Sequence, residues 1–178
     1  MKTMRYFFAL AAAAPLLAFG AFQPAAGQQG GSALRGHNSD APIDWGAERI
    51  EVQDRTNRVI LTGKVVAKQA NLTLNAERIT VAYLQNDGIK VQRIDASGGV
   101  LLRSPSETAR GEFAIYDLGQ RIITLIGNVT LTRDGSDVNG GRLVLDLDSG
   151  RAVMDGTASS GATPGRVTGT FLVPKRSE

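Results

Sequence analysis

The stretch IITLIGNVTLTRDGSDVNGGRLVLDLDSGRAVMDG, residues 122–156, decides the fold. Apolar and polar residues alternate along most of it, which is the period of a β-strand that buries one face. Asp134-Gly135 and Ser149-Gly150 interrupt the alternation with residues typical of tight turns. The stretch therefore predicts consecutive strands joined by short turns.

The same unit recurs towards the N-terminus. The hexapeptides AERIEV (47–52) and AERITV (76–81) are nearly identical and begin 29 residues apart. Four further segments carry a glycine at the same place: RVILTGKV (58–65), RIDASGGV (93–100), IITLIGNV (122–129) and RAVMDGTA (151–158). Outside residues 1–27, no segment repeats its apolar residues with the period of a helix. We therefore expect an all-β chain built from about three and a half strand–turn–strand units.

The repeated glycines are Gly63, Gly98, Gly127 and Gly156. A glycine inside a strand marks a bulge, a sharp bend or a close backbone approach. Four of them in register would bend every strand along one line and fold the sheet into a V or a flattened roll. A plain β-meander with turn glycines is the alternative, and the register favours the folded sheet.

The two ends of the chain differ from this repeat. Lys2 and Arg5, the apolar run Tyr6 to Phe22 and the small residues Ala25-Ala26-Gly27 predict a signal peptide over residues 1–27, cleaved near Gly27. A retained membrane anchor is the alternative, because about 17 apolar residues can suffice to span a bilayer.

Two polar segments flank the expected β domain, residues 43–157. Residues 28–42 are rich in Gly, Gln and Ser and predict a flexible lead-in with little to bury. Residues 158–178 form a linker followed by a possible edge strand, Arg166 to Val173. That strand could close the end of the roll or pair with a neighbouring molecule, and both possibilities stay open.

Charge and composition exclude several classes of protein. The net charge is +3, and it falls to +1 without Lys2 and Arg5 of the leader. Nucleic acid is not expected as a partner, because binding it requires a basic patch and aromatic platforms.

Candidate catalytic and metal-binding residues lack the companions that they need. His37 is the only histidine and there is no cysteine, so a zinc site or a nucleophile–base pair cannot be assembled. Residues 146–150 resemble a calcium loop, but Thr157 stands where a glutamate is required. Candidate carboxylates for glycoside hydrolysis lack an aromatic sugar platform: Asp95, Glu107 and Asp117. We predict no enzymatic activity, no metal ion and no cofactor.

Several segments together resemble the OstA-like domain of the LptA family of periplasmic lipopolysaccharide-transport proteins. They are LNAERITVAY (74–83), RIDASGGV (93–100), ARGEFAIYD (109–117) and residues 122–156, preceded by the leader. The resemblance runs from about Ile43 to Gly156 and implies a twisted, incompletely closed antiparallel β jelly roll with an apolar lining. The chain departs from the family in its extension after Gly156, and in alanines and glycines where larger residues could line the groove.

The resemblance also implies a function. Family members bind the lipid A acyl chains of lipopolysaccharide in the groove and stack end to end between an inner-membrane LptC-like protein and an outer-membrane LptD-like protein. We therefore expect a periplasmic bridge component that forms head-to-tail homo-oligomers. The residues expected to contact acyl chains are Leu61, Val65, Ile79, Val81, Ile94, Val100, Phe113, Ile115, Leu125, Val129, Leu143 and Leu145. Arg78, Arg110 and Arg142 recur near the starts of returning strands and are the expected headgroup ligands near the mouth.

Three alternatives remain at this point. The same apolar residues could simply pack as a closed core. The chain could be an LptC-like, membrane-anchored component of the same bridge. It could also be a β-solenoid, with a role at the cell surface or in carbohydrate chemistry.

Overall fold

The structure is a computed structural model and describes residues 34, 37–85, 88–156 and 165–173. The predicted signal peptide, residues 1–27 with its cleavage near Gly27, lies outside these residues. The described chain forms ten strands and one 3₁₀ turn, η1 (Asp54–Thr56). The strands are β1 (Ile43–Gly46), β2 (Arg49–Gln53), β3 (Arg58–Gln69), β4 (Leu72–Gln85), β5 (Ile89–Arg103), β6 (Glu107–Asp117), β7 (Ile122–Arg133), β8 (Ser136–Asp146), β9 (Arg151–Asp155) and β10 (Thr168–Thr170).

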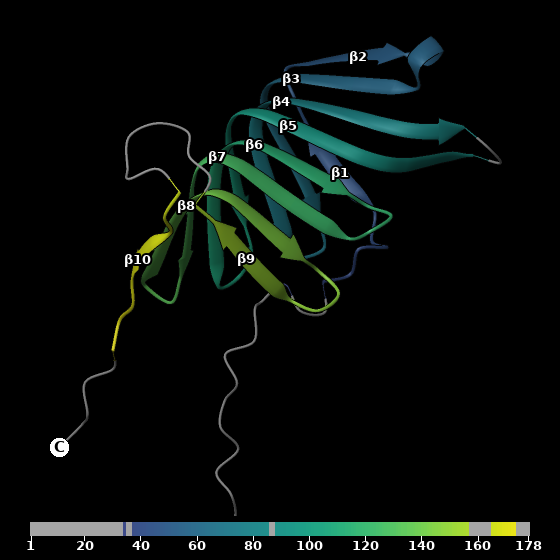
Figure 1. Cartoon of the computed structure of the whole chain (residues 1–178). Helices are drawn as coiled ribbons and strands as arrows, with labels where there is room; N and C mark the ends of the chain where they lie inside the picture. The colour runs from purple at the N-terminus through teal and green to yellow at the C-terminus, as the bar shows by residue number, and fades with distance from the viewer. Residues whose placement is uncertain (1–33, 35–36, 86–87, 157–164, 174–178) are drawn as a thin grey trace, which may run out of the picture.

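All ten strands belong to one antiparallel sheet. Its order is β1-β3-β4-β5-β6-β7-β8-β10, with β2 also paired to β3 and β9 also paired to β8 (Figure 1). No pairing between β1 or β2 and β9 or β10 is found among the described residues, so the sheet does not close into a barrel. The predicted all-β, incompletely closed antiparallel fold is confirmed.

The long strands bend along one line that crosses the sheet. Each pairing from β3·β4 to β7·β8 carries a register shift near its middle. At this line β3, β5 and β7 each contain two consecutive residues with positive φ: Gly63-Lys64, Gly98-Gly99 and Gly127-Asn128. Two residues on these strands face one on the neighbour, which is a β-bulge and bends the strand.

The predicted glycine register is confirmed for Gly63, Gly98 and Gly127, whose φ angles are 85°, 85° and 84°. Gly156 differs, because it follows the end of β9 and its φ lies outside the left-handed region. A glutamate side chain lies against each of the three bulge glycines: Glu48 on Gly63, Glu77 on Gly98 and Glu112 on Gly127. Glu48 and Glu77 belong to the two AERI segments, so the sequence repeat is also a packing repeat.

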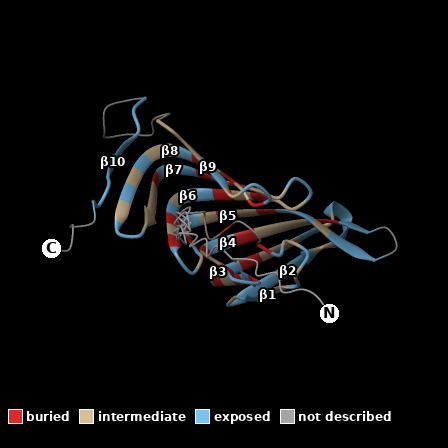
Figure 2. Ribbon diagram, turned by 90° about the horizontal axis from the view of Figure 1, so that it is seen from below, coloured by how far each residue is buried: buried red, intermediate tan, exposed pale blue. Residues whose placement is uncertain are grey.

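The bend divides the sheet into two layers that face each other. The first layer contains β2, β9 and residues 58–62, 78–85, 89–97, 113–117, 122–126 and 142–146. The second layer contains β1, β10 and residues 65–69, 72–76, 100–103, 107–111, 129–133 and 136–140. Buried positions alternate with exposed ones along the strands of both layers (Figure 2). The hydrophobic core lies between the layers, on the inner face of each.

The C-terminal strand pairs with its own chain. The predicted strand Arg166 to Val173 is present as the shorter β10, whose Thr168–Thr170 pair with Asn139, Val138 and Asp137 of β8. The backbone N–H of Leu172 also donates to Ser136 Oγ at 3.1 Å. In this structure β10 therefore covers the second-layer half of β8.

Candidate functional site

The candidate site is the inner face of the bent sheet. Ten of the twelve residues predicted to contact acyl chains lie on this face and are buried or half-buried. They are Leu61, Val65, Ile79, Val81, Ile94, Val100, Leu125, Val129, Leu143 and Leu145. All belong to, or pack against, one hydrophobic cluster that joins the two layers.

Phe113 and Ile115 lie on the opposite face, and their predicted inward placement is wrong. Ile115 pairs with Asp95 and Thr124, while Phe113 is 50% exposed. Directly opposed residues share a face of the sheet, and the buried residues of β6 are Ala114 and Tyr116. Residues 113–116 are all apolar or aromatic. The alternation therefore could not show which alternate pair points inward.

The inner face reaches the surface at the N-terminal end of the roll. Ile50 and Val52 of β2 oppose Leu61 and Val59, and Trp45 of β1 opposes the buried Ala67. All three side chains thus share the inner face, yet they are 47%, 57% and 52% exposed. They are exposed because no further strand follows β1 and β2 among the described residues, so an apolar lining opens to solvent here.

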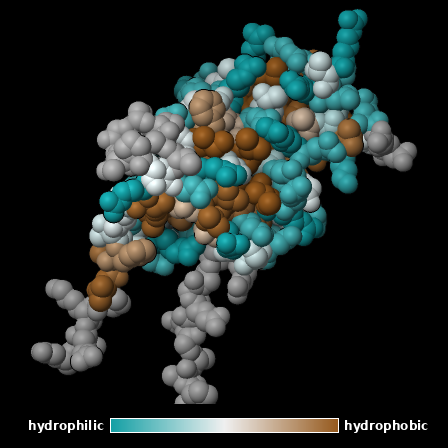
Figure 3. All heavy atoms as spheres, viewed as in Figure 1, coloured by the Kyte–Doolittle hydropathy of each residue, from teal (hydrophilic) through white to brown (hydrophobic). Residues whose placement is uncertain are grey.

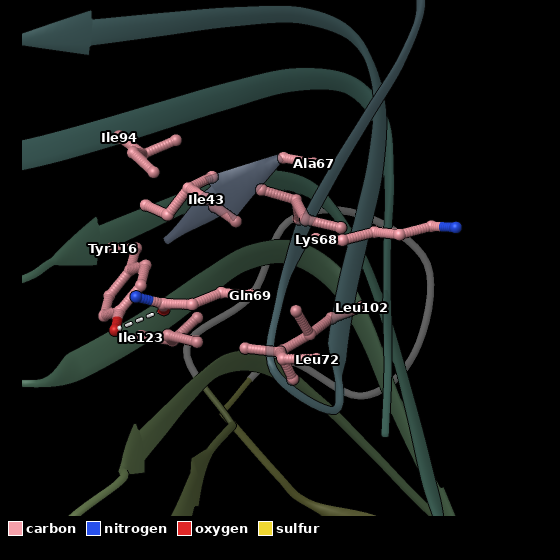
Figure 4. Close-up of a pocket in the computed structure, with 11 residues that line it drawn as sticks. Ile43, Ala67, Lys68, Gln69, Leu72, Ile94, Leu102, Tyr116 and Ile123 are labelled. Carbon is pink, nitrogen blue, oxygen red and sulfur yellow. Dashed lines mark hydrogen bonds between the residues drawn. The ribbon is translucent and has the colours of Figure 1, made fainter. Parts of the chain in front are cut away.

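A small cavity of about 30 Å³ lies between the layers. Figure 4 shows Ile43, Ala67, Ile94, Leu72, Leu102 and Ile123 around it, while the amine of Lys68 points away. The polar groups in its wall are Gln69 of β3 and Tyr116 of β6, and the Tyr116 hydroxyl donates to Gln69 Oε1 at 3.1 Å. Burial raises the pKa of Tyr116, so its phenol stays a hydrogen-bond donor at neutral pH.

The lead-in residues also contribute to this interior. Leu34 is 2% exposed and belongs to the core cluster, and His37 is buried. The prediction of little burial before residue 43 is wrong for these two side chains. Leu34 lies in a second small gap between the layers, lined by Leu72, Leu102, Ala109, Leu131 and Leu145.

Gln69 connects the lead-in to the sheet. Its Nε2 donates to the carbonyls of Ser39 (2.8 Å) and Ala41 (3.0 Å), so its Oε1 accepts from Tyr116 and from His37 Nε2 (3.2 Å). The other ring nitrogen of His37 lies 3.0 Å from Asn71 Oδ1. All the polar atoms of the buried amide therefore have partners, which makes the arrangement specific.

The predicted headgroup arginines do not line the opening of the roll. Arg78, Arg110 and Arg142 oppose outer-face residues, and Arg142 lies 3.6 Å from Asp155. Their predicted position near the mouth is wrong, because each arginine lies on the outer face of the sheet, opposite to the face that forms the core.

Other cations line a polar cleft of about 590 Å³ beside the lead-in: Lys90, Arg93 and Arg121. Arg121 contacts Asp148 at 3.1 Å and Asp40 at 3.2 Å, and the hydrogen bond and charge of Asp148 raise its pKa. Asp40 and Asp117 also line the cleft. Arginine recognises carboxylates and phosphates through the same planar donors, so the Arg121 guanidinium can bind either anion.

The three carboxylates considered for hydrolysis have structural roles. Glu107 is buried and pairs with Arg133, Asp95 pairs with Arg93 at 2.7 Å, and Asp117 accepts from the backbone of Gln120 at 2.9 Å.

Sequence reasoning missed Gln69, Tyr116 and the buried His37. A usable signal for Gln69 was its place on the inner parity directly after Val65 and Ala67, where a polar side chain needs buried partners. Nothing near His37 in sequence pointed to its partners, which lie more than 30 positions away.

Comparisons with known proteins agree with this architecture. Residues 46–151 match the model of a family described as LptA/(LptD N-terminal domain) LPS transport protein. A relative from Rhizobium meliloti (strain 1021), described as Uncharacterized protein R00383, is 31% identical over 125 residues, which are 66% of this chain and 67% of the relative. A solved structure, that of LptH, the LptA homologous periplasmic component of the lipopolysaccharide transport device from Pseudomonas aeruginosa, superposes with a TM-score of 0.67.

The LptH match has 18% sequence identity and covers 77% of this chain and 99% of that chain, so it supports the fold. The described residues contain no helix that is long and apolar enough to cross a membrane. Because the family match extends over more than half of the chain, this chain belongs to the LptA and LptD N-terminal domain family of lipopolysaccharide-transport proteins.

Proposed function

We propose that this chain is a periplasmic bridge component that carries lipopolysaccharide from the inner towards the outer membrane, with the acyl chains held against the inner face of the roll. Membership of the family supports the role. The observation that carries the proposal is the continuous apolar inner face, which opens to solvent at Trp45, Ile50 and Val52.

The physical need for such a carrier is large. Burial of each methylene contributes about 0.8 kcal/mol, so exposing an acyl chain of about a dozen carbons to water costs roughly 9 kcal/mol. A lipid with several chains cannot cross an aqueous compartment on that scale without a continuous apolar path. A single roll provides only a short apolar path. The proposal therefore requires several copies of the chain to associate into a longer one.

We further propose that copies associate head to tail, with LptC-like and LptD-like proteins at the two ends of the assembly. The outer edges of β1 and β2 have no partner strand among the described residues, and such edges template pairing with another chain. The two ends of the roll are different surfaces, so association between them is heterologous and propagates. It would also continue one apolar lining from copy to copy.

A photo-crosslinking pair tests the lipid site without a buried substitution. Ile50 and Phe113 have similar exposure, 47% and 50%, but lie on opposite faces of the sheet. A photoreactive amino acid at position 50 should crosslink to bound lipid A, and the same group at position 113 should not. Equal crosslinking from both positions, or none from position 50 with lipid bound, would contradict the proposal.

The membrane-anchored alternative rests on the apolar run Tyr6 to Phe22, which lies outside the described residues. Intact-mass measurement on membrane and periplasmic fractions decides between the two: the bridge proposal expects a soluble chain that begins near Gln28. A membrane-bound chain that retains Met1 to Gly27 would select the LptC-like role. The β-solenoid alternative is wrong, because every described strand pair is antiparallel whereas coils of a β-helix stack in parallel.

A further inference from the structure

The lead-in occupies the interior that the proposed function assigns to lipid. We call Leu34 together with residues 37–42 the strap. Leu34 lies between the layers against Leu102, Ala109 and Leu131, with 2% of its surface exposed. Three backbone hydrogen bonds shape the strap, from His37 to Leu34, Ser39 to His37 and Ala41 to Asn38.

With the strap in place, the interior has little free room. The cavity beside Gln69 and Tyr116 measures about 30 Å³, and the gap beside Leu34 measures about 10 Å³. A cavity needs about 10–15 Å³ measured in this way to hold one water molecule, so these two spaces have room for a few waters at most and neither admits an acyl chain. Entry of lipid at this place therefore requires something to leave, and the strap is the element here that does not belong to the sheet.

The strap connects the turn ends of the two layers. On the second layer, His37 and the carbonyls of Ser39 and Ala41 are held by Gln69 at the end of β3. On the first layer, Asp40 pairs with Arg121, which follows β6 and also contacts Asp148. The strap thus spans the open side of the roll, where the layers are not joined by β-pairing.

We propose that the strap is a built-in substitute for lipid, which lipopolysaccharide must displace before it binds. Leu34 takes the place of acyl-chain carbon between the layers, and the Asp40 carboxylate takes the place of a headgroup phosphate on Arg121. This inference rests on the proposed function, and it assigns the headgroup site to Arg121 with Lys90 and Arg93 of the same cleft.

Charge favours the exchange. A phosphate carries about −1.5 to −2 charges and three acceptor oxygens, against one charge on Asp40. The Arg121–Asp40 pair is largely solvent-exposed, with the Asp40 side chain 83% exposed, so it is weak enough to be replaced. An empty carrier thereby keeps its apolar interior covered, and release of the strap is coupled to arrival of the ligand.

The absence of cysteine allows a direct test. In a Leu34→Cys variant, reaction with a maleimide reports whether the strap leaves the interior. We expect saturating lipid A to raise the reaction rate at least about tenfold. Ala96→Cys, buried on the inner face of β5, is the control and should stay protected, because only the strap moves. Lipid A that binds to saturation while the Leu34→Cys thiol stays protected would overturn the inference.

A second measurement uses two aspartates. Asp40→Asn should raise the affinity for lipid A by up to about fivefold, because it weakens the competing contact and raises the fraction of open protein. Asp44→Asn, an exposed aspartate on β1 outside the strap, should leave the affinity unchanged. The Asp40→Asn gain should shrink for lipid A stripped of its phosphates, and equal effects of the two substitutions would count against the inference.

Failure of the proposed function would give a different result from failure of the strap inference. If lipid A binds neither to the native chain nor to Leu34→Asp, whose charge should expel the strap, then the proposed function itself fails and the strap has no ligand to replace. If Leu34→Asp binds lipid A with the affinity of the native chain, and the thiol of Leu34→Cys stays protected when lipid A is bound, the proposed function stands and the strap inference is rejected.

Discussion

The two ends of the roll are built differently. At the N-terminal end, β1 and β2 expose the inner-face residues Trp45, Ile50 and Val52 beside backbone edges that have no partner among the described residues. At the C-terminal end, β10 covers part of β8, and Met154 of β9 is half-buried over Leu143. One end is an open apolar edge, and the other is partly covered by its own chain.

The cover at the C-terminal end is thin. β10 has only three residues, and the tail beyond it exposes apolar side chains, with Phe171 at 75% and Val173 at 84%. Figure 3 shows hydrophobic surface at the lower left, where Figure 1 places β10 and the chain that follows it. An open edge opposite a loosely covered one is what directional, head-to-tail addition needs, since two identical ends would favour closed dimers.

The largest expected effect comes from charging the open end. The double substitution Ile50→Lys and Val52→Lys should weaken self-association on the order of 100-fold, because two ammonium groups would have to be desolvated in an apolar interface. Both side chains are exposed, so the monomer should keep its fold. Sedimentation velocity across protein concentrations measures the association, with Leu84→Lys and Ile89→Lys in the β4–β5 hairpin as the matched control.

Mixing sharpens this test. A molecule with a blocked N-terminal end still offers its C-terminal end, so a small amount added to native protein should terminate growing chains and shorten them. If the N-terminal ends paired with each other instead, the blocked molecules would stay apart and native assemblies would keep their size. That second result would rule out head-to-tail order.

The next effect compares a glycine at each end. Gly63 has φ of 85°, and an added Cβ would lie 2.8 Å from the Cβ of Glu48, so Gly63→Ala should lower the free energy of unfolding by about 1–3 kcal/mol. At Gly156 the backbone is unstrained, but an added Cβ would lie 2.5 Å from backbone atoms of Gly165 and Arg166. Gly156→Ala should therefore displace the tail with a smaller loss of stability. Urea denaturation and limited proteolysis of the tail separate the two outcomes, and equal stability losses would contradict the comparison.

Removal of the C-terminal cover should have a smaller effect, and it should strengthen self-association. Deleting residues 166–178 uncovers the edge of β8 at Asp137–Asn139, so association should strengthen by about tenfold. If Phe171 and its neighbours were themselves the contact, the same deletion would weaken association. Sedimentation velocity of full-length and truncated chains gives the sign directly.

The sequence predicted the fold well because the repeat carries redundant information. Alternation, glycine register and turn residues all pointed to one bent antiparallel sheet, and Gly63, Gly98 and Gly127 lie at its bend. The prediction was wrong where a local pattern was ambiguous. Residues 113–116 are apolar on both parities, and Phe113 was placed inward although Ala114 and Tyr116 are the buried pair.

The polar part of the site could not be predicted from the sequence, for a different reason. The contacts of His37 with Gln69 and Asn71, and of Arg121 with Asp40, join residues that are distant in sequence and meet only when the two layers fold together. Composition alone predicts a polar lead-in, and it cannot show that Leu34 is buried among apolar residues from five strands.

The smallest expected difference concerns the bulges themselves. At the N-terminal bulge Lys64 Nζ lies 2.8 Å from Glu48 Oε1, whereas at the β7 bulge Asn128 Nδ2 donates to Glu112 at 2.6 Å. Glu48→Gln should cost about 0.2–1 kcal/mol, since both partners of the ion pair are well exposed. That cost should nearly vanish in 1 M salt, where the screening length falls to about 3 Å. Glu112→Gln keeps an acceptor for the Asn128 amide, so its cost should depend little on salt.

Urea denaturation of both variants in low and high salt measures these costs. Lys64→Gln completes a double-mutant cycle that gives the interaction energy of the Glu48–Lys64 pair. A Glu48→Gln cost that is unchanged by salt would show that the N-terminal bulge is held by the packing of Glu48 on Gly63 and not by its charge.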